Sequence, residues 1–245
     1  MSAVRVDLKT ADGMLDVHVL TPDEGAGPWS PVVLYMDAFG IRSELTGMAQ
    51  RLASHGYLVA VPNLYYRTPF APFEPKAVAI EGPERDRFRG MIGSISHAMV
   101  MRDTGVLIEW LDGHRQVRRG AFAALGYCMG GGYALSAAGT FPDRFGVAVS
   151  FHGGSLATDK PDSPHRLAGR MRARVYVGAA EIDATFPPDQ QERLARALTE
   201  AGVTHTIEIY PNAKHGFAVT GHLAYDRESS ERHWHRLVGL LEETL

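Results

Sequence analysis

The stretch AFAALGYCMGGGYAL, residues 121–135, indicates the fold because it joins an apolar run to a helical pattern through a turn of small residues. Its first five residues are continuously apolar, which is typical of a strand buried on both faces of a sheet. Gly126 and Gly130 lie two residues on either side of Cys128. Small residues are needed at these positions in a tight turn because side chains there would collide with the backbone. Two further glycines would let the helix pack close to the strand, so the stretch predicts a strand–turn–helix unit.

The rest of the chain repeats this alternation of apolar runs and helically spaced segments. Asp12-Gly13 lies between two alternating runs and predicts a hairpin. The predicted strands are 4–8, 15–20, 32–37, 57–64, 121–126, 145–153, 173–183 and 204–211, and the predicted helices are 43–56, 95–113, 131–140, 188–201 and 224–244. Segment 62–93 is expected to form loops and short helices. The pattern predicts a single α/β domain over residues 1–245, with a mostly parallel central sheet, helices on both faces and an N-terminal antiparallel hairpin.

The composition narrows the class of protein. The 245 residues are 45% hydrophobic and carry a formal charge of −3, so no basic field for nucleic acid is expected. No apolar run approaches the roughly 18 residues of a membrane span, and residues 1–10 lack the apolar core of a signal peptide. One cysteine cannot form an internal disulfide. These features predict a cytoplasmic, globular protein with no membrane or nucleic-acid partner, present as a monomer or homodimer.

The turn around Cys128 has the pattern of a nucleophile elbow, with cysteine where serine usually stands. The helix that follows would favour a thiolate at its N-terminus. The alternative is that Cys128 is a small buried hydrophobe, which is common for cysteine. In this architecture an acid and then a histidine follow the elbow in chain order. Asp183 and His215 come at the ends of two later predicted strands, so the three side chains could converge.

Other residues compete for these roles. Glu181 could be the acid, although it lies nearer its strand, and Asp189 is expected to begin a helix. His152 also ends a strand, but it precedes any strand-end acid and is expected to be structural. The backbone amides of Ala38 and Met129 are candidate oxyanion donors. No Cys, His or Asp spacing suggests a metal site, and no cofactor is expected.

The sequence resembles the dienelactone hydrolase family of the α/β-hydrolase superfamily. The residues that carry the resemblance are MDAFG (36–40), VPNLYYR (61–67), GYCMGG (126–131), EID (181–183) and KHGF (214–217). The resemblance implies the α/β-hydrolase fold. It also implies Cys128 as nucleophile, His215 as base and Asp183 as its orienting acid. Ala38 and Met129 would supply the oxyanion hole.

Two departures from the family pattern concern the substrate. Asp37 stands where members that hydrolyse dienelactone usually have a glutamate that interacts with the thiol, so Asp37 is a candidate modulator of the thiol or contact for substrate. Val219 stands where those members have one of two arginines that hold the substrate carboxylate. Arg85 best matches the other, with Arg87 and Arg89 as alternatives, and exposed helix arginines are an equally good interpretation.

The predicted function is hydrolysis of a small-molecule carboxylic ester or lactone through an acyl-thioester intermediate. Hydrolysis of other activated esters, phosphoesters included, is an alternative. A non-catalytic redox sensor is another, although the chain has no second cysteine to resolve an oxidised Cys128. Some of six aromatic residues near strand ends could line an apolar pocket. They are Phe39, Tyr65, Tyr66, Phe70, Phe73 and Phe217.

Overall fold

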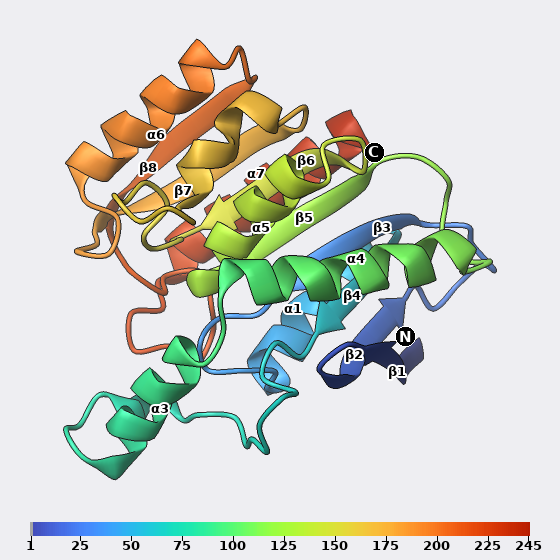
Figure 1. Cartoon of the computed structure of the whole chain (residues 1–245), viewed down its shortest axis with the longest axis horizontal. Coiled ribbons are helices and arrows are strands. Elements are labelled where there is room, and N and C mark those ends of the chain that lie inside the picture. Colours follow the sequence, from blue (N-terminus) through green and yellow to red (C-terminus); the bar gives the residue numbers. More distant parts are fainter. Residues whose placement is uncertain (1) are drawn as a thin grey trace.

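The computed structural model describes residues 2–245, and its centre is one eight-stranded sheet (Figure 1). The strand order is β1-β2-β4-β3-β5-β6-β7-β8. The hairpin β1–β2 and the pair β2–β4 are antiparallel, whereas all later pairs are parallel. The strands are β1 (Ser2–Thr10), β2 (Gly13–Thr21), β3 (Ser30–Tyr35), β4 (Tyr57–Pro62), β5 (Phe122–Tyr127), β6 (Phe145–Phe151), β7 (Arg174–Ile182) and β8 (His205–Lys214). The predicted sheet with its antiparallel edge is confirmed.

Helices cover both faces of this sheet. One face carries α4, α5, α6 and a 3₁₀ helix, and the other carries α1 and α7 (Figure 1). The helices are α1 (Ser43–Ser54), α2 (Pro75–Val78), α3 (Pro83–Gly93), α4 (His97–Gly113), α5 (Met129–Thr140), the 3₁₀ helix Pro164–Arg170, α6 (Pro188–Glu200) and α7 (Arg227–Thr244). The predicted loop segment 62–93 contains the short helices α2 and α3.

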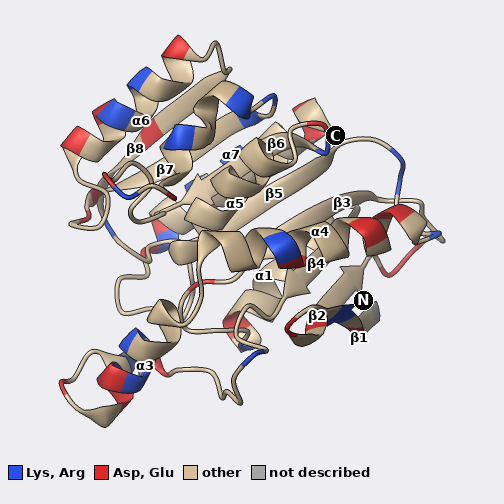
Figure 2. Cartoon of the chain, in the orientation of Figure 1, with Lys and Arg blue, Asp and Glu red and all other residues tan. Residues whose placement is uncertain are grey.

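The four central strands explain why the sheet is covered on both sides. β3, β4, β5 and β6 contain no charged residue, and nearly all of their side chains are buried. Such strands gain stability only when both faces are removed from water. Charged side chains lie instead on the outer surfaces of helices such as α3, α4 and α6 (Figure 2). No helix among residues 2–245 is both long and apolar enough to cross a membrane.

The C-terminal ends of the parallel strands form the edge where a site is expected. β3 lies between β4 and β5, and the helices that follow β3 and β5 cover opposite faces of the sheet. A crevice between strand ends arises where the chain changes face in this way. Helix α3 extends beyond this edge, at the lower left of Figure 1.

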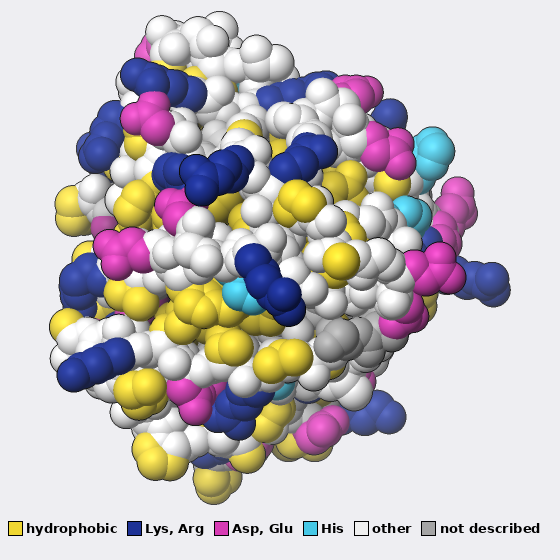
Figure 3. Space-filling view, turned by 90° about the vertical axis from the view of Figure 1, so that its right-hand side faces the viewer, with side chains coloured by type: hydrophobic (Ala, Val, Ile, Leu, Met, Phe, Trp, Pro, Cys, Tyr) yellow, Lys and Arg dark blue, Asp and Glu magenta, His cyan; other side chains and the backbone are white. Residues whose placement is uncertain are grey.

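The opposite side of the molecule carries a groove of about 260 Å³ that both apolar and polar side chains line. It lies beside the hairpin and the last turn of α4, and apolar side chains gather in the middle of that face (Figure 3). Its lining includes Val4, Val6, Val19, Trp29, Trp110 and His114. Trp29 precedes β3, so this groove is separated from the C-terminal strand ends by the length of the sheet.

Candidate active site

Cys128 occupies the sharp turn between β5 and α5. Its φ of 55° lies in the left-handed region that side-chain-bearing residues rarely adopt. Its N–H donates to the carbonyl oxygen of Phe151 on β6 (3.2 Å). A Cβ on Gly126 would overlap the carbonyl group of Gly130, and a Cβ on Gly130 would overlap the carbonyl of Tyr35. The two glycines are therefore required by close backbone contact, as the sequence predicts, and the thiol is left partly exposed.

Asp183 and His215 come together above the sheet. Asp183 follows β7 and His215 follows β8, and Asp183 Oδ2 lies 2.7 Å from His215 Nδ1. The Asp183 side chain is only 2% exposed, against 25% for His215. Thr185 donates to Asp183 Oδ1 through both its backbone N–H (2.8 Å) and its hydroxyl (2.6 Å). The carboxylate is thus fixed from two sides, and Thr185 is a contributor that the sequence motifs do not include.

Burial and charge act on His215 in opposite directions. Burial lowers the pKa of its imidazole, but the charge of Cys128 and the hydrogen bonds with Asp183 and Cys128 raise that pKa to about 10. Burial raises the pKa of Asp183, but hydrogen bonds and charge from His215, together with Thr185, hold it below its ordinary value. At neutral pH this geometry favours a protonated His215 between two acidic groups.

His152 lies behind His215. Its ring is 5.3 Å from the ring of His215 and 5.3 Å from that of Phe217, both edge to face. The side chain is buried, neither ring nitrogen has a partner within the described residues, and burial lowers its pKa well below the ordinary value. His152 is therefore uncharged at neutral pH and packs against the ring of His215.

The loop after β3 is held by Asp37. Its Oδ1 accepts the N–H of Phe39 (3.0 Å), and both carboxylate oxygens bind the guanidinium of Arg42 (2.6 and 2.8 Å). Arg42 also donates to the carbonyl of Gly40 (3.3 Å), whose N–H donates back to the carbonyl of Asp37 (3.2 Å). Both oxygens of Asp37 are thus engaged within the loop, and its partner is Arg42.

Tyr65 links the two residues whose amides are the candidate oxyanion donors. Its buried hydroxyl donates to the carbonyl of Ala38 (3.0 Å) and lies 3.7 Å from Sδ of Met129. Met129 is the first residue of α5, where backbone N–H groups have no acceptor within the helix. Sequence reasoning placed Tyr65 among possible pocket residues but gave no reason to connect it with Ala38.

Four of the six aromatic residues that were candidates for a pocket lie together, and the other two lie elsewhere. Phe39, Tyr65, Phe70 and Phe73 form one cluster with Phe88 of α3, at ring separations of 4.8–5.2 Å. Tyr66 and Phe217 are not part of it. The Tyr66 hydroxyl bonds to Thr10 and Asp103, and the Phe217 ring stacks on Tyr210. The sequence gave no reason to include Phe88, because its contacts depend on where α3 lies.

His222 also borders the site and was not predicted. Its ring lies edge-on to Phe39 (5.7 Å) and fills the space beside Gly216, the residue after His215. Gly216 has a φ of 95°, so a side chain there would be strained as well as obstructed. Burial, followed by the charge of His215, lowers the pKa of His222.

The candidate substrate arginines lie on α3, and two of them pair with acids of the same segment. Arg85 lies 3.6 Å from Glu81, and Arg87 binds both oxygens of Glu84 (2.6 and 3.0 Å). Arg89 is exposed. Val219 is completely buried.

The rival acids lie apart from His215. Glu181 accepts the N–H of Asn212, and Asp189 is in the first turn of α6. Residues 2–245 contain no group of three or more His, Cys, Asp and Glu side chains that could hold a metal ion.

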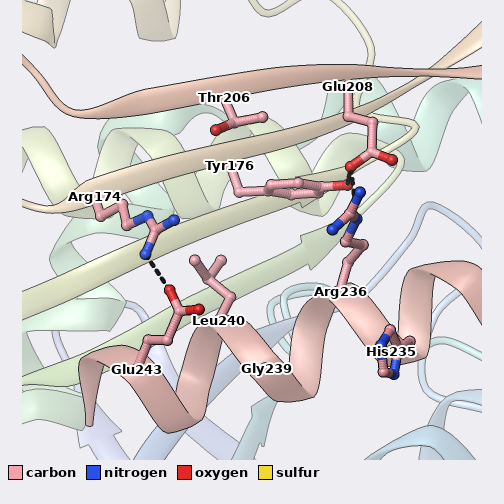
Figure 4. A pocket seen from close by; sticks show the side chains of 9 residues that line it. All are labelled: Arg174, Tyr176, Thr206, Glu208, His235, Arg236, Gly239, Leu240 and Glu243. Carbon is pink, nitrogen blue, oxygen red and sulfur yellow. Dashed lines mark hydrogen bonds and ion pairs between the residues drawn. The ribbon is translucent and has the colours of Figure 1, made fainter.

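A groove of about 330 Å³ between β7, β8 and α7 contains none of the predicted site residues (Figure 4). Its charged side chains pair with one another. Arg174 binds Glu243 (2.6 Å), while Glu208 binds both the Tyr176 hydroxyl (2.7 Å) and Arg236 (3.0 Å). These contacts join the last helix to the edge of the sheet.

Comparison with known proteins agrees with this arrangement. Residues 15–245 match the profile of the Dienelactone hydrolase family. The chain belongs to the dienelactone hydrolase family. It is therefore a hydrolase that acts on ester or lactone bonds.

Individual relatives are distant in sequence but cover most of the chain. A Yersinia pestis protein whose name assigns it to the carboxymethylenebutenolidases is 25% identical, covering 91% of this chain and 82% of its own. Among solved structures, a Klebsiella pneumoniae protein named as a dienelactone hydrolase superposes with a TM-score of 0.83 at 24% identity, covering 97% of both chains. A dienelactone hydrolase-like promiscuous phosphotriesterase from metagenomic libraries superposes with a TM-score of 0.81 at 23% identity. The match covers 99% of this chain and 98% of the other. The predicted α/β-hydrolase fold is confirmed.

Proposed function

We propose that this dienelactone hydrolase family member hydrolyses carboxylic esters or lactones by covalent catalysis at Cys128, with His215 as the proton-transfer group and Asp183 as its orienting acid. The observation that carries the proposal is the hydrogen bond between His215 and Asp183 at the C-terminal strand ends, together with the effect of the nearby Cys128 on the pKa of His215. A nucleophile paired with a base that a third group orients is the arrangement such catalysis needs.

The reaction would proceed through a thioester. The Cys128 sulfur attacks the carbonyl carbon, and the amides of Ala38 and Met129 hydrogen-bond to the oxyanion that forms. Collapse breaks the carbon–oxygen bond, and the departing alkoxide takes the proton from His215. Water then attacks the thioester while His215 accepts its proton. Breakage of the carbon–sulfur bond releases the carboxylic acid and restores the thiolate.

The substitution Cys128→Ala tests this proposal. We expect it to abolish turnover of 4-nitrophenyl butyrate while the melting temperature stays close to that of the unaltered protein. A wild-type sample stopped within the first turnovers should contain one acyl group on Cys128 by mass spectrometry. Turnover by Cys128→Ala at the wild-type rate would overturn the assignment of the nucleophile.

Two alternatives give different results in the same assay. A phosphotriester hydrolase would turn over paraoxon with a kcat/KM equal to or above that for carboxylic esters. A redox sensor would hydrolyse no ester of the panel and would form a stable sulfenic acid at Cys128 with hydrogen peroxide. The proposal predicts a clear preference for carboxylic esters over paraoxon.

A further inference from the structure

We propose that the site selects substrates whose acyl group is uncharged, because the charges that border it are already paired. This inference rests on the proposed function, since it describes what Cys128 acylates. Selection of an uncharged acyl group differs from recognition of a carboxylate, because a carboxylate needs a cation that is free to pair with it.

The most buried cation beside the site is already bound. The Arg42 side chain is 8% exposed, forms a bidentate pair with Asp37 and lies 3.6 Å from Glu44. Its guanidinium also lies over the ring of Phe39 (5.2 Å). A substrate carboxylate could pair with Arg42 only by displacing Asp37, which would leave a buried carboxylate without its cation.

The proposed catalytic groups add no positive charge. His215 is flanked by Asp183 and the Cys128 thiol, and with the thiolate formed the three groups carry one net negative charge. The charges of Cys128 and Asp37 both act on Tyr65 and contribute to its raised pKa, after the larger effect of burial. An anionic acyl group would therefore enter a region of like charge.

Several aromatic and histidine side chains beside the site are neutral at neutral pH. Burial lowers the pKa of His222, with a further contribution from the charge of His215. Burial raises the pKa values of Tyr65 and Tyr133, both of which experience the charge of Cys128. The Phe39–Phe88 stack continues this uncharged surface toward α3. Such a wall suits an aryl or alkyl acyl group.

Of the other candidate positions, Arg85 and Arg87 are paired and Val219 carries no charge, whereas Arg89 is exposed. Arg87 binds Glu84 and lies over the ring of Phe73 (3.9 Å). Arg85 pairs with Glu81, and Val219 brings only a buried apolar side chain. Arg85 and Arg87 are each partly exposed and Arg89 is exposed, so an extended anionic substrate could recruit a cation only from α3, of which Arg85 is the best match to the family pattern.

The test compares two aryl esters that differ in charge but hardly in shape. These are the 4-nitrophenyl esters of 4-carbamoylbenzoic acid and of terephthalic acid, with each rate normalised to the rate of hydrolysis by hydroxide. Like charges about 6 Å apart at an effective dielectric constant near 20 repel enough to change a rate on the order of 100-fold. We therefore expect kcat/KM for the carbamoyl ester to exceed that for the carboxylate ester by about this factor. Rates within threefold of one another, or a preference for the carboxylate, would overturn the inference.

A second pair of probes reports on the same electrostatics without requiring turnover. Iodoacetamide and iodoacetate both alkylate a thiolate and differ in charge. We expect iodoacetamide to alkylate Cys128 faster by at least about tenfold, after normalisation to N-acetylcysteine. Equal alkylation rates, or faster alkylation by iodoacetate, would contradict the inference whether or not the protein hydrolyses the esters. Failure to hydrolyse either ester would instead count against the proposed function.

The variant Arg85→Ala tests whether Arg85 binds the carboxylate of an anionic substrate. If Arg85 leaves the acyl site uncharged, the variant should change both ester rates by less than twofold. A selective loss of carboxylate-ester hydrolysis in Arg85→Ala would show that the site recruits Arg85 for anions and would overturn the inference.

Discussion

At Cys128, different neighbours control the backbone and the side chain. The turn depends on Gly126, Gly130 and the carbonyl of Phe151, whereas the thiol acts electrostatically on His215. The glycine requirement could be predicted from the sequence because it depends on residues within one short segment. The hydrogen bonds of Thr185 to Asp183 are also local, since the two residues lie two apart in one loop. The contact of His152 with His215 could not be predicted, because it depends on tertiary packing.

Substitution of Gly130 should show how tightly the elbow is packed. Gly130→Ala places a Cβ against the backbone of Tyr35, and we expect a loss of about 3 kcal/mol or more in the free energy of unfolding. Gly90→Ala in α3 is the matched control, because a Cβ there meets open space and alanine favours a helix by about 0.5–1 kcal/mol. Urea denaturation measures both variants. Equal stabilities would show that the elbow can relax around the new methyl group.

Removing the charge of Asp183 should change the protonation of His215. In Asp183→Asn we expect the pKa of His215 to fall from about 10 toward its ordinary value of 6.5, because the carboxylate that stabilises the imidazolium is gone. NMR of protein labelled with ¹⁵N-histidine would follow the titration, and kcat should fall on the order of 10³–10⁴-fold. Asp189→Asn on α6 is the control and should change neither quantity. An unmoved titration would mean that Asp183 does not govern His215.

At the scale of elements, the loop after β3 holds most of the contacts that could not be predicted from the sequence. Asp37 could be located from the motif, but its pairing with Arg42 depends on how the loop folds back over five residues. Tyr65 comes from the loop after β4 and reaches Ala38 across the strand ends. Strand ends can be predicted from apolar patterns, whereas contacts between the loops depend on the three-dimensional order of the strands.

Tyr65→Phe should test whether this loop positions an oxyanion donor. Loss of the hydroxyl leaves the buried carbonyl of Ala38 without its donor, and we expect kcat to fall about tenfold with KM nearly unchanged. Tyr66→Phe removes a neighbouring hydroxyl that bonds to Thr10 and Asp103, so it should lower stability without lowering kcat. A kcat loss of equal size in both variants would indicate a general structural effect.

The start of α7 offers a measure of local helix stability. The side chain of Asp226 caps the helix by accepting the N–H of Ser229 (2.8 Å), and the hydrogen bonds from Ser229 lower its pKa. Asp226→Ala should cost about 1 kcal/mol at pH 7, while Asp226→Asn should cost less because it keeps an acceptor oxygen. Because the pKa is lowered on folding, this contribution should be present above pH 3.8 and decline as the pH falls further. A pH-independent difference between Asp226→Ala and wild type would contradict this.

At the scale of the whole molecule, buried histidines should limit stability in acid. His233 is completely buried against the hydroxyl of Tyr127 (3.0 Å), and burial lowers its pKa to about 3. Below pH 6.5 the unfolded chain binds a proton that the folded chain does not, so His233 alone removes about 1.4 kcal/mol per pH unit. His215 acts in the opposite sense, because its raised pKa makes its contribution fall as the pH rises through about 10. Because the His215 contribution declines over the whole range from pH 6.5 to about 10, we expect greatest stability near pH 6.5.

Urea unfolding at pH 7 and pH 5 would measure the acid limb. His233→Gln keeps a side chain that can bond to Tyr127 but cannot titrate, so its stability should fall less between the two pH values than that of wild type. His205→Gln, at the start of the edge strand β8, serves as the control and should retain the wild-type slope. An unchanged slope in His233→Gln would show that other groups set the acid limit.

The turn at Cys128 has a consequence for how such a protein can change through evolution. Its left-handed backbone is imposed by two glycines and a neighbouring strand, so the turn does not depend on whether sulfur or oxygen stands at the γ position. Cysteine and serine codons can differ by a single base. One nucleotide substitution could therefore exchange the reacting element while leaving the scaffold intact. Lineages built on this turn can sample two chemistries without crossing a misfolded intermediate.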